Sequence, residues 1–185
     1  MLEAVRFGFI AILGAPNAGK STLINRIVGA QVTIVSPKVQ TTRTRVLGIV
    51  ARNKSQLVFV DTPGIFAPRR RLDRAMVDAA WKGAADADIL VLLVDSERGF
   101  NANTRRFVEQ IKGDAVLVLN KIDQVDDKEL IDLVEMEIRE LLTSYEFPGD
   151  TTPIIKGSAL AAMEEKDEEI GKNSILELLK AVDEH

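Results

Sequence analysis

The most constraining feature of this sequence is a glycine-rich loop between an apolar run and a helical segment. Residues 7–13 are almost entirely apolar, as a buried strand requires, and Gly14 and Gly19 then bracket a loop that ends at Lys20 and Ser21. Glycine lets the backbone turn so that consecutive N–H groups converge at the positive end of the following helix. The chain therefore predicts a strand, an anion-binding loop and a helix, an arrangement that suits a phosphate group.

Short apolar runs alternate with helical periodicity along the rest of the chain, the pattern of parallel strands joined by helices. Strands are expected at residues 7–13, 46–51, 57–60, 89–94, 115–119 and 153–156, and helices at 20–28, 72–85, 103–112, 127–144 and 174–182. We therefore expect an α/β fold, a P-loop domain with a mostly parallel six-stranded sheet and helices on both faces. The apolar stripe expected on the helix at 127–144 comprises Leu130, Leu133, Val134, Met136, Ile138, Leu141 and Leu142.

Length and composition predict one domain spanning residues 1–185. The chain is 46% apolar and long enough to bury a sizeable core. It has no cysteine, and its one histidine is the terminal His185, which excludes disulfides, thiolate metal sites and a histidine base. No apolar run reaches the roughly 18 residues of a membrane span, and the first residues lack the apolar core of a secretory signal. A cytoplasmic protein without a membrane span is expected.

The net charge of −4 conceals an asymmetry along the chain. Through Asp123 there are 18 lysines and arginines against 11 acidic residues, whereas the remainder has 6 against 17. A boundary in composition therefore lies just after Asp123. Acidic helices of this kind are also ordinary solvated faces, so the asymmetry alone does not decide its origin.

Three segments suit the phosphates and a metal ion. Lys20 is expected to neutralise the β- and γ-phosphates, and the Ser21 hydroxyl is expected to bind Mg²⁺, which prefers hard oxygen ligands. Asp61 follows a strand and would contact the metal directly or through water, while the N–H of Gly64 would meet the γ-phosphate. Thr42, in the polar stretch 40–43, is assigned to close over metal and phosphate; Thr41 and an ordinary solvated loop are the alternatives.

The segment 120–123 indicates that the base is guanine. The Asp123 carboxylate can accept from N1–H and the exocyclic N2–H of guanine, whereas adenine offers an acceptor at N1 and no 2-amino group. Lys121 can lay its aliphatic stem on the ring, Asn120 can tie this segment to the phosphate loop, and the N–H of Ala159 would donate to O6. The expected ligands are therefore GTP or GDP with Mg²⁺.

The candidate site residues fall into three groups. Those assigned to the nucleotide are Asn17, Ala18, Gly19, Lys20, Ser21, Thr22, Asn120, Lys121, Asp123, Ser158, Ala159 and Leu160. Those assigned to the metal are Ser21, Thr42 and Asp61, and those assigned to catalysis are Lys20, Thr42 and Gly64.

These motifs carry a family resemblance. Residues 7–123 resemble the GTPase domain of the Era family, bacterial GTPases linked to small-subunit ribosome assembly, through the segments 14–26 (GAPNAGKSTLINR), 36–43 (SPKVQTTR) and 61–64 (DTPG). The resemblance implies in-line attack of water on the γ-phosphate and a nucleotide-dependent switch. Era proteins also carry a C-terminal RNA-binding KH domain, and none is recognised in this sequence.

From about residue 124 the resemblance changes. The segments 125–130, 133–142, 147–150, 152–155 and 157–160 are similar to the nucleotide-binding domain of elongation factor Tu, whose two β-barrel domains are not recognised here. The sequence therefore suggests a mosaic with an Era-like front and a Tu-like back, and a divergent natural protein is the alternative. In a mosaic, the helices at 103–112 and 127–144 would come from different parents and risk imperfect packing.

Two expectations concern activity and partners. Ile65 follows Gly64 where many GTPases place a side chain that orients water, so slow intrinsic hydrolysis is expected; a module with little hydrolysis is the alternative. The arginines at positions 69–71 could stabilise charge or could simply be solvated. The parent family contacts the ribosome or small-subunit RNA, but the acidic back half predicts weak RNA binding here, and a monomer is expected.

Overall fold

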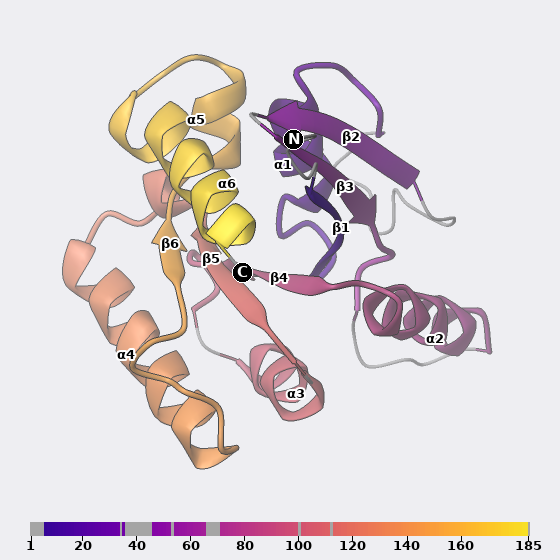
Figure 1. Ribbon diagram of the computed structural model, residues 1–185. Helices are drawn as coiled ribbons and strands as arrows, with labels where there is room; N and C mark the ends of the chain where they lie inside the picture. Colours follow the sequence, from indigo (N-terminus) through magenta and orange to yellow (C-terminus); the bar gives the residue numbers. More distant parts are fainter. Residues whose placement is uncertain are drawn as a thin grey trace.

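The computed structural model describes residues 6–33, 35, 46–52, 54–65, 71–99, 101–111 and 113–184 (Figure 1). Its strands are β1 (Arg6–Gly14), β2 (Val46–Arg52), β3 (Ser55–Asp61), β4 (Ile89–Asp95), β5 (Ala115–Asn120) and β6 (Ile154–Lys156). Its α-helices are α1 (Lys20–Val28), α2 (Arg71–Ala85), α3 (Ala102–Gln110), α4 (Lys128–Ser144), α5 (Ala159–Met163) and α6 (Ser174–Glu184). A 3₁₀ turn at Ile122–Gln124 and a π-helical turn at Glu169–Asn173 complete the described elements.

The six strands form one sheet in the order β2-β3-β1-β4-β5-β6. β2 pairs antiparallel with β3, and the other neighbouring strands pair in parallel. The predicted α/β class and the mostly parallel six-stranded sheet are therefore confirmed, and β2 is an edge strand. The inner strands are covered by helices on both faces. Their sequences are therefore nearly continuous runs of apolar residues.

Two apolar cores lie on opposite faces of the sheet, and Figure 1 shows the helices that cover these faces. Helices α1, α5 and α6 cover one face, and their buried side chains include Leu23, Ile24, Ala162 and Leu178. Helices α2, α3 and α4 cover the other face, with Ala80, Phe107, Val108, Ile138 and Leu142 among the buried side chains.

The predicted apolar stripe of α4 is partly wrong. Its buried side chains are Ile131, Val134, Ile138 and Leu142, whereas Leu130, Leu133 and Met136 are exposed. Spacings of three, four and four residues keep the buried set on one face of a helix with 3.6 residues per turn. The exposed set recurs every three residues and therefore turns away from that face. Helix α4 presents apolar side chains on two sides, and only one side packs on the sheet.

The helices at the predicted composition boundary share one core. Phe107 and Val108 of α3 belong to the same buried cluster as Ile131 and Val134 of α4. The Tyr145 hydroxyl, just after α4, donates to Glu109 of α3 at 2.7 Å. The packing between the two predicted parent segments is therefore apolar and continuous.

Other boundaries differ from the predictions at helix ends. Helix α3 ends at Gln110 rather than at 112, because Ile111 already has extended backbone angles. The five-residue helix α5 was not predicted, because a run of alanines shows no amphipathic period. Within the described part of the chain, no helix combines the length and apolar character that a membrane crossing needs.

The parallel strands all end at one edge of the sheet, which is where the sequence motifs meet. Gly14, Asp61, Asp95, Asn120 and Lys156 are the last residues of β1, β3, β4, β5 and β6. Ligands of open α/β sheets bind outside the carboxyl ends of the strands. The fold therefore brings the predicted phosphate, metal and base segments together.

Candidate nucleotide-binding site

The phosphate loop is shaped by close backbone contacts. Gly14 pairs with Leu93 of β4, and a Cβ at position 14 would lie 2.6 Å from the Leu93 carbonyl oxygen. Gly19 has φ of 99°, a left-handed conformation, and its missing side chain leaves room for the Asn120 amide. Glycine is therefore required at both positions, and the loop leads directly into α1 at Lys20.

Lys20 is buried at the centre of this loop. Its Nζ donates to the carbonyl oxygens of Gly14 at 3.1 Å and Ala15 at 2.9 Å. Burial lowers the Lys20 pKa from 10.5 to about 8, and the nearby Asp61 carboxylate opposes part of that shift. A phosphate beside this ammonium would raise the pKa again, so the site favours an anion.

The two described residues assigned to the metal lie in contact. The Ser21 hydroxyl donates to Asp61 Oδ2 at 2.9 Å, and Asp61 is fully buried. The neighbouring Thr62 hydroxyl donates to the Ile12 carbonyl at 2.6 Å, which fastens the end of β3 to β1. A hydroxyl and a carboxylate at this position form an oxygen donor set that suits Mg²⁺.

The segment after Asp61 packs on the phosphate loop. A Cβ on Gly64 would lie 2.8 Å from Pro16 Cα, so only glycine permits this approach. The Ile65 N–H donates to the Gly14 carbonyl at 3.1 Å, and the Ile65 side chain is buried in the core beneath α2 and α3. Ile65 therefore does not direct a polar group toward the site.

Asn120 joins three segments of the site. Its Nδ2 donates to the Ala18 carbonyl at 2.7 Å, as the sequence predicted, and its Oδ1 accepts from the Ala159 N–H at 2.8 Å. Both bonds are buried. The phosphate loop, the end of β5 and the start of α5 are therefore held together by one amide.

Ala159 already has a hydrogen-bond partner within the protein. Its N–H, expected to donate to a guanine O6, donates to Asn120 Oδ1 in this structure. The preceding Ser158 caps α5 by accepting from the Ala161 N–H at 3.0 Å. A base oxygen would therefore have to share the Ala159 donor with Asn120.

The remaining predicted nucleotide residues differ in how far they are buried. Asp123 lies exposed in the 3₁₀ turn after β5, and Asn17 and Leu160 are also exposed. Ala18 is fully buried, and Thr22 is half-buried on α1. The positions Thr41, Thr42, Arg69, Arg70 and His185 lie outside the described residues.

Sequence reasoning missed Asp95, the last residue of β4. Lys121 Nζ forms an ion pair with Asp95 Oδ2 at 2.6 Å, and the Asp95 side chain is only 4% exposed. The available signal was a carboxylate directly after a run of buried apolar residues, at the edge where the other motifs gather.

Asn25 was also missed. Its Oδ1 accepts from the N–H groups of Val32 and Thr33, both at 2.9 Å, and its Nδ2 donates to the Thr33 carbonyl. The Thr33 hydroxyl in turn donates to the Ser21 carbonyl at 3.1 Å. This network holds the chain that leaves α1 against the start of the same helix.

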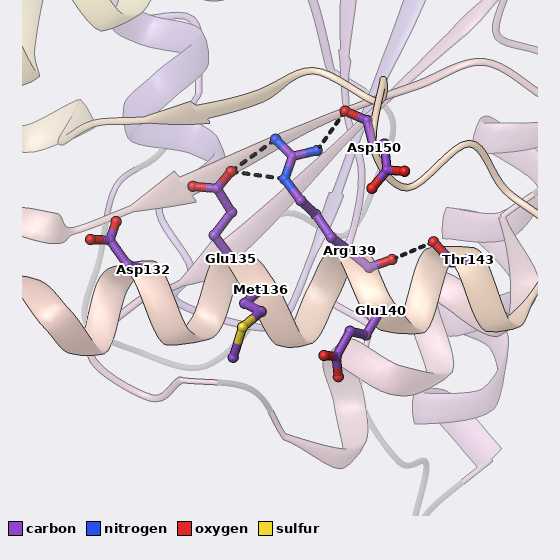
Figure 2. Close-up of a pocket in the computed structure, with 7 residues that line it drawn as sticks. All are labelled: Asp132, Glu135, Met136, Arg139, Glu140, Thr143 and Asp150. Atoms are coloured by element: carbon purple, nitrogen blue, oxygen red, sulfur yellow. Dashed lines mark hydrogen bonds and ion pairs between the residues drawn. The ribbon is translucent and has the colours of Figure 1, made fainter.

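A hollow of about 550 Å³ lies on the outer side of α4 (Figure 2). Arg139 is engaged there by Glu135 at 2.8 Å and by the Gly149 carbonyl at 2.6 Å. The other charged side chains of the lining, Asp132, Glu140 and Asp150, are acidic. A phosphate would be repelled here, so the strand-end site is the better nucleotide site.

Comparison with known families agrees with this geometry. The sequence model of the family described as 50S ribosome-binding GTPase matches residues 9–121. The chain belongs to this GTPase family. Among curated relatives, GTPase Era of Sinorhizobium medicae is 60% identical over 131 residues, which cover 69% of this chain and 42% of that protein. GTPase Era of Brucella suis is 55% identical over 133 residues, covering 70% of this chain and 43% of the relative. The matched part of the chain thus covers less than half the length of these relatives.

Solved Era structures share the fold over nearly the whole chain. Era in complex with MgGDPNP and nucleotides 1506–1542 of 16S ribosomal RNA superposes with a TM-score of 0.80 and 31% identity. A variant of Aquifex aeolicus Era bound to GDP·AlF₄⁻ gives a TM-score of 0.79 and 32% identity. Each match covers 96% of this chain and 56% of the Era chain.

Proposed function

We propose that this domain binds GTP with Mg²⁺ and hydrolyses it slowly to GDP and phosphate, as a nucleotide-dependent switch of the Era type. The observation that carries the proposal is the Asn120 amide, which bonds to Ala18 of the phosphate loop and Ala159 of the base segment. The phosphate loop and the base segment are thereby held at a fixed separation, as the binding of one nucleotide by both requires.

The phosphates would lie on the N-terminus of α1. Lys20 would exchange its two carbonyl acceptors for phosphate oxygens, and the loop from Asn17 to Gly19 would donate N–H groups. Ser21 and Asp61 would hold Mg²⁺, and Thr42 would add a ligand four positions before Val46, which pairs with Asp61 in the sheet. Mg²⁺ held there would supply positive charge to stabilise the phosphate oxygens.

Asp123 would select guanine. Its carboxylate would accept from N1–H and the 2-amino group, while the Lys121 stem would pack on the ring. The Ala159 N–H would be shared between the base oxygen and Asn120, as a three-centre hydrogen bond. Ser158 and Leu160 would act by holding the first turn of α5 in place.

Hydrolysis would be slow because the Ile65 side chain is apolar and buried in the core, where it cannot orient a water molecule. The proposed catalytic groups are Lys20, Thr42 and the Gly64 N–H, which would stabilise the developing charge as water attacks in line. Placing the attacking water would then depend on backbone, metal and the segments around the γ-phosphate.

Nucleotide titration and phosphate release test this proposal. The parent chain should bind GDP in preference to ADP and release phosphate from GTP over several turnovers. Lys20→Ala should weaken GDP binding by roughly 2 to 4 kcal/mol, because it removes charge-assisted bonds. Ser21→Ala should chiefly weaken Mg²⁺-dependent GTP binding, and exposed Lys82→Ala is the matched control. Equal binding of GDP and ADP by the parent would refute the proposal.

We also propose that residues from about 124 onward derive from an elongation factor Tu-like domain. The family match ends at residue 121, and the Sinorhizobium relative matches 69% of the chain, whereas Era structures superpose on 96%. The part of the chain that matches in sequence is thus shorter than the part that superposes. The nucleotide sequence of the source gene tests this: an uninterrupted Era gene encoding the same residues would rule out a mosaic.

RNA contact is proposed to be weak for this chain by itself. One similar structure is Era bound to a 16S ribosomal RNA fragment, but this chain carries a net charge of −4 with 17 acidic residues after Asp123. Phosphate neutralisation dominates RNA affinity. Filter binding to a small-subunit RNA fragment at near-physiological salt should show little retention, and GTP-dependent sub-micromolar binding would contradict this view.

A further inference from the structure

The ends of β4 and β5 are locked together beside the candidate base site. Asp95 and Asn120 are paired in the parallel register of these two strands. The N–H of Ser96 donates to the Asn120 carbonyl at 2.9 Å, which extends the ladder one residue past β4. The backbone of Asp95, and with it the Asp95 carboxylate, is therefore held close to the segment that starts at Asn120.

Asp95 uses this position to hold Lys121. Its Oδ2 accepts from Lys121 Nζ at 2.6 Å, and the side chains are 4% and 20% exposed. Lys121 itself has a backbone φ of 64°, a left-handed conformation that residues other than glycine rarely adopt. A fixed backbone turn at one end and an ion pair at the other leave the four-carbon stem little freedom.

The ion pair is held in place by burial. Asp95 Oδ1 and the Ser96 hydroxyl are both buried without a hydrogen-bond partner among the described residues. Arg98 approaches the same Asp95 oxygen only at 3.6 Å and is 56% exposed. If Lys121 moved away, the buried carboxylate would lose the closest of its cationic partners among the described residues, which is costly in a low-dielectric setting.

We propose that Asp95 is a positioning residue for the nucleotide base, and this inference rests on the proposed function. Asp95 holds the Lys121 stem as a preorganised apolar surface, and the base selected by Asp123 packs against it. Asp95 touches no part of the nucleotide and acts through Lys121 alone. Its removal therefore weakens the base contact and leaves the phosphate chemistry unchanged.

Titration with GDP tests the positioning role. Asp95→Ala should weaken GDP binding about tenfold, because a charge-assisted bond that orders the stem is lost. Asp95→Asn keeps the shape and one acceptor and should lose less. The single-turnover rate at saturating GTP should be unchanged in both, since the base contact is the same in ground and transition states.

A double-mutant cycle with Lys121→Ala decides whether Asp95 acts through Lys121. The double variant should bind GDP no more weakly than Lys121→Ala alone, whereas additive losses would overturn the inference. Arg98→Ala is the control and should bind like the parent. If Asp95→Ala does not fold, by circular dichroism, the same cycle with Asp95→Asn applies. A parent chain that fails to bind GDP refutes the proposed function, whereas a parent that binds and an Asp95→Ala that binds equally refute this inference alone.

Discussion

The Asn120 side chain donates to the carbonyl of Ala18, 102 positions earlier in the chain, across 2.7 Å. The same amide accepts from Ala159, 39 positions later. Asn120 is 3% exposed, so both bonds form away from water. One side chain thus joins the loop after β1 to the segment after β6. The site therefore forms only when the strands of the sheet have come together.

Asn120→Ala should destabilise the protein and weaken nucleotide binding together. The Ala18 carbonyl and the Ala159 N–H would both lose a buried partner, for which a cost of about 2–4 kcal/mol is expected. Urea unfolding monitored by circular dichroism measures the first effect, and GDP titration measures the second. Gln110→Ala, an exposed amide at the end of α3, is the control. An Asn120→Ala protein as stable as the control would contradict the coupling.

The coupling could be predicted only in part from the sequence. The contact of Asn120 with the phosphate loop follows from the order of strands in a parallel sheet, because both segments follow strands that end at the same edge. The bond to Ala159 could not be derived in the same way. A side-chain amide has both donor and acceptor sites, and the tertiary arrangement chooses which backbone groups satisfy them.

Local features were predicted best. The bounds of α1 were predicted correctly, because a glycine precedes Lys20 and another follows Val28. The role of Asp95 was missed because it depends on an ion pair with Lys121, which is distant in sequence. The orientation of α4 was partly missed because its apolar residues lie on more than one face, and only packing on the sheet decides which are buried.

GDP binding should weaken as pH rises through about 8. Burial holds the Lys20 pKa near 8, so the free protein loses the ammonium above that pH, and less cation is available for the phosphates. Lys20→Met should bind weakly and lack this pH dependence. GDP titrations of the parent and of Lys20→Met at several pH values distinguish deprotonation of Lys20 from deprotonation of the guanine base. An identical pH profile in Lys20→Met would show that Lys20 is not responsible.

The contribution of Lys20 to the free energy of unfolding, measured without nucleotide, should rise over the pH range in which GDP binding weakens. Because the Lys20 pKa is about 8 when folded and 10.5 otherwise, the unfolded chain binds more protons between these values. The contribution of Lys20 to the free energy of unfolding therefore rises as pH increases from about 8 to 10.5. Thermal unfolding of the parent minus that of Lys20→Met isolates this contribution. A difference that stays constant over this range would contradict the burial effect.

Asp123→Asn should shift base preference from guanine toward xanthine. The carboxylate can only accept hydrogen bonds, whereas the amide can also donate to the 2-oxo group of xanthine. Competition binding with GDP, XDP and ADP measures the change in preference. Asp126→Asn, an exposed acid three positions later, should bind like the parent. Unchanged selectivity in Asp123→Asn would remove Asp123 from the base site.

The two sides of α4 should respond differently to truncation. Ile138 is fully buried between the helix and the sheet, whereas Met136 is 52% exposed. Ile138→Ala should therefore lower the free energy of unfolding by about 2–5 kcal/mol, because it leaves a cavity that the surrounding side chains fill only partly. Met136→Ala should change it by less than about 0.5 kcal/mol. Urea unfolding midpoints at equal slope provide the comparison. A larger loss for Met136→Ala than for Ile138→Ala would show that α4 packs through the other side in solution.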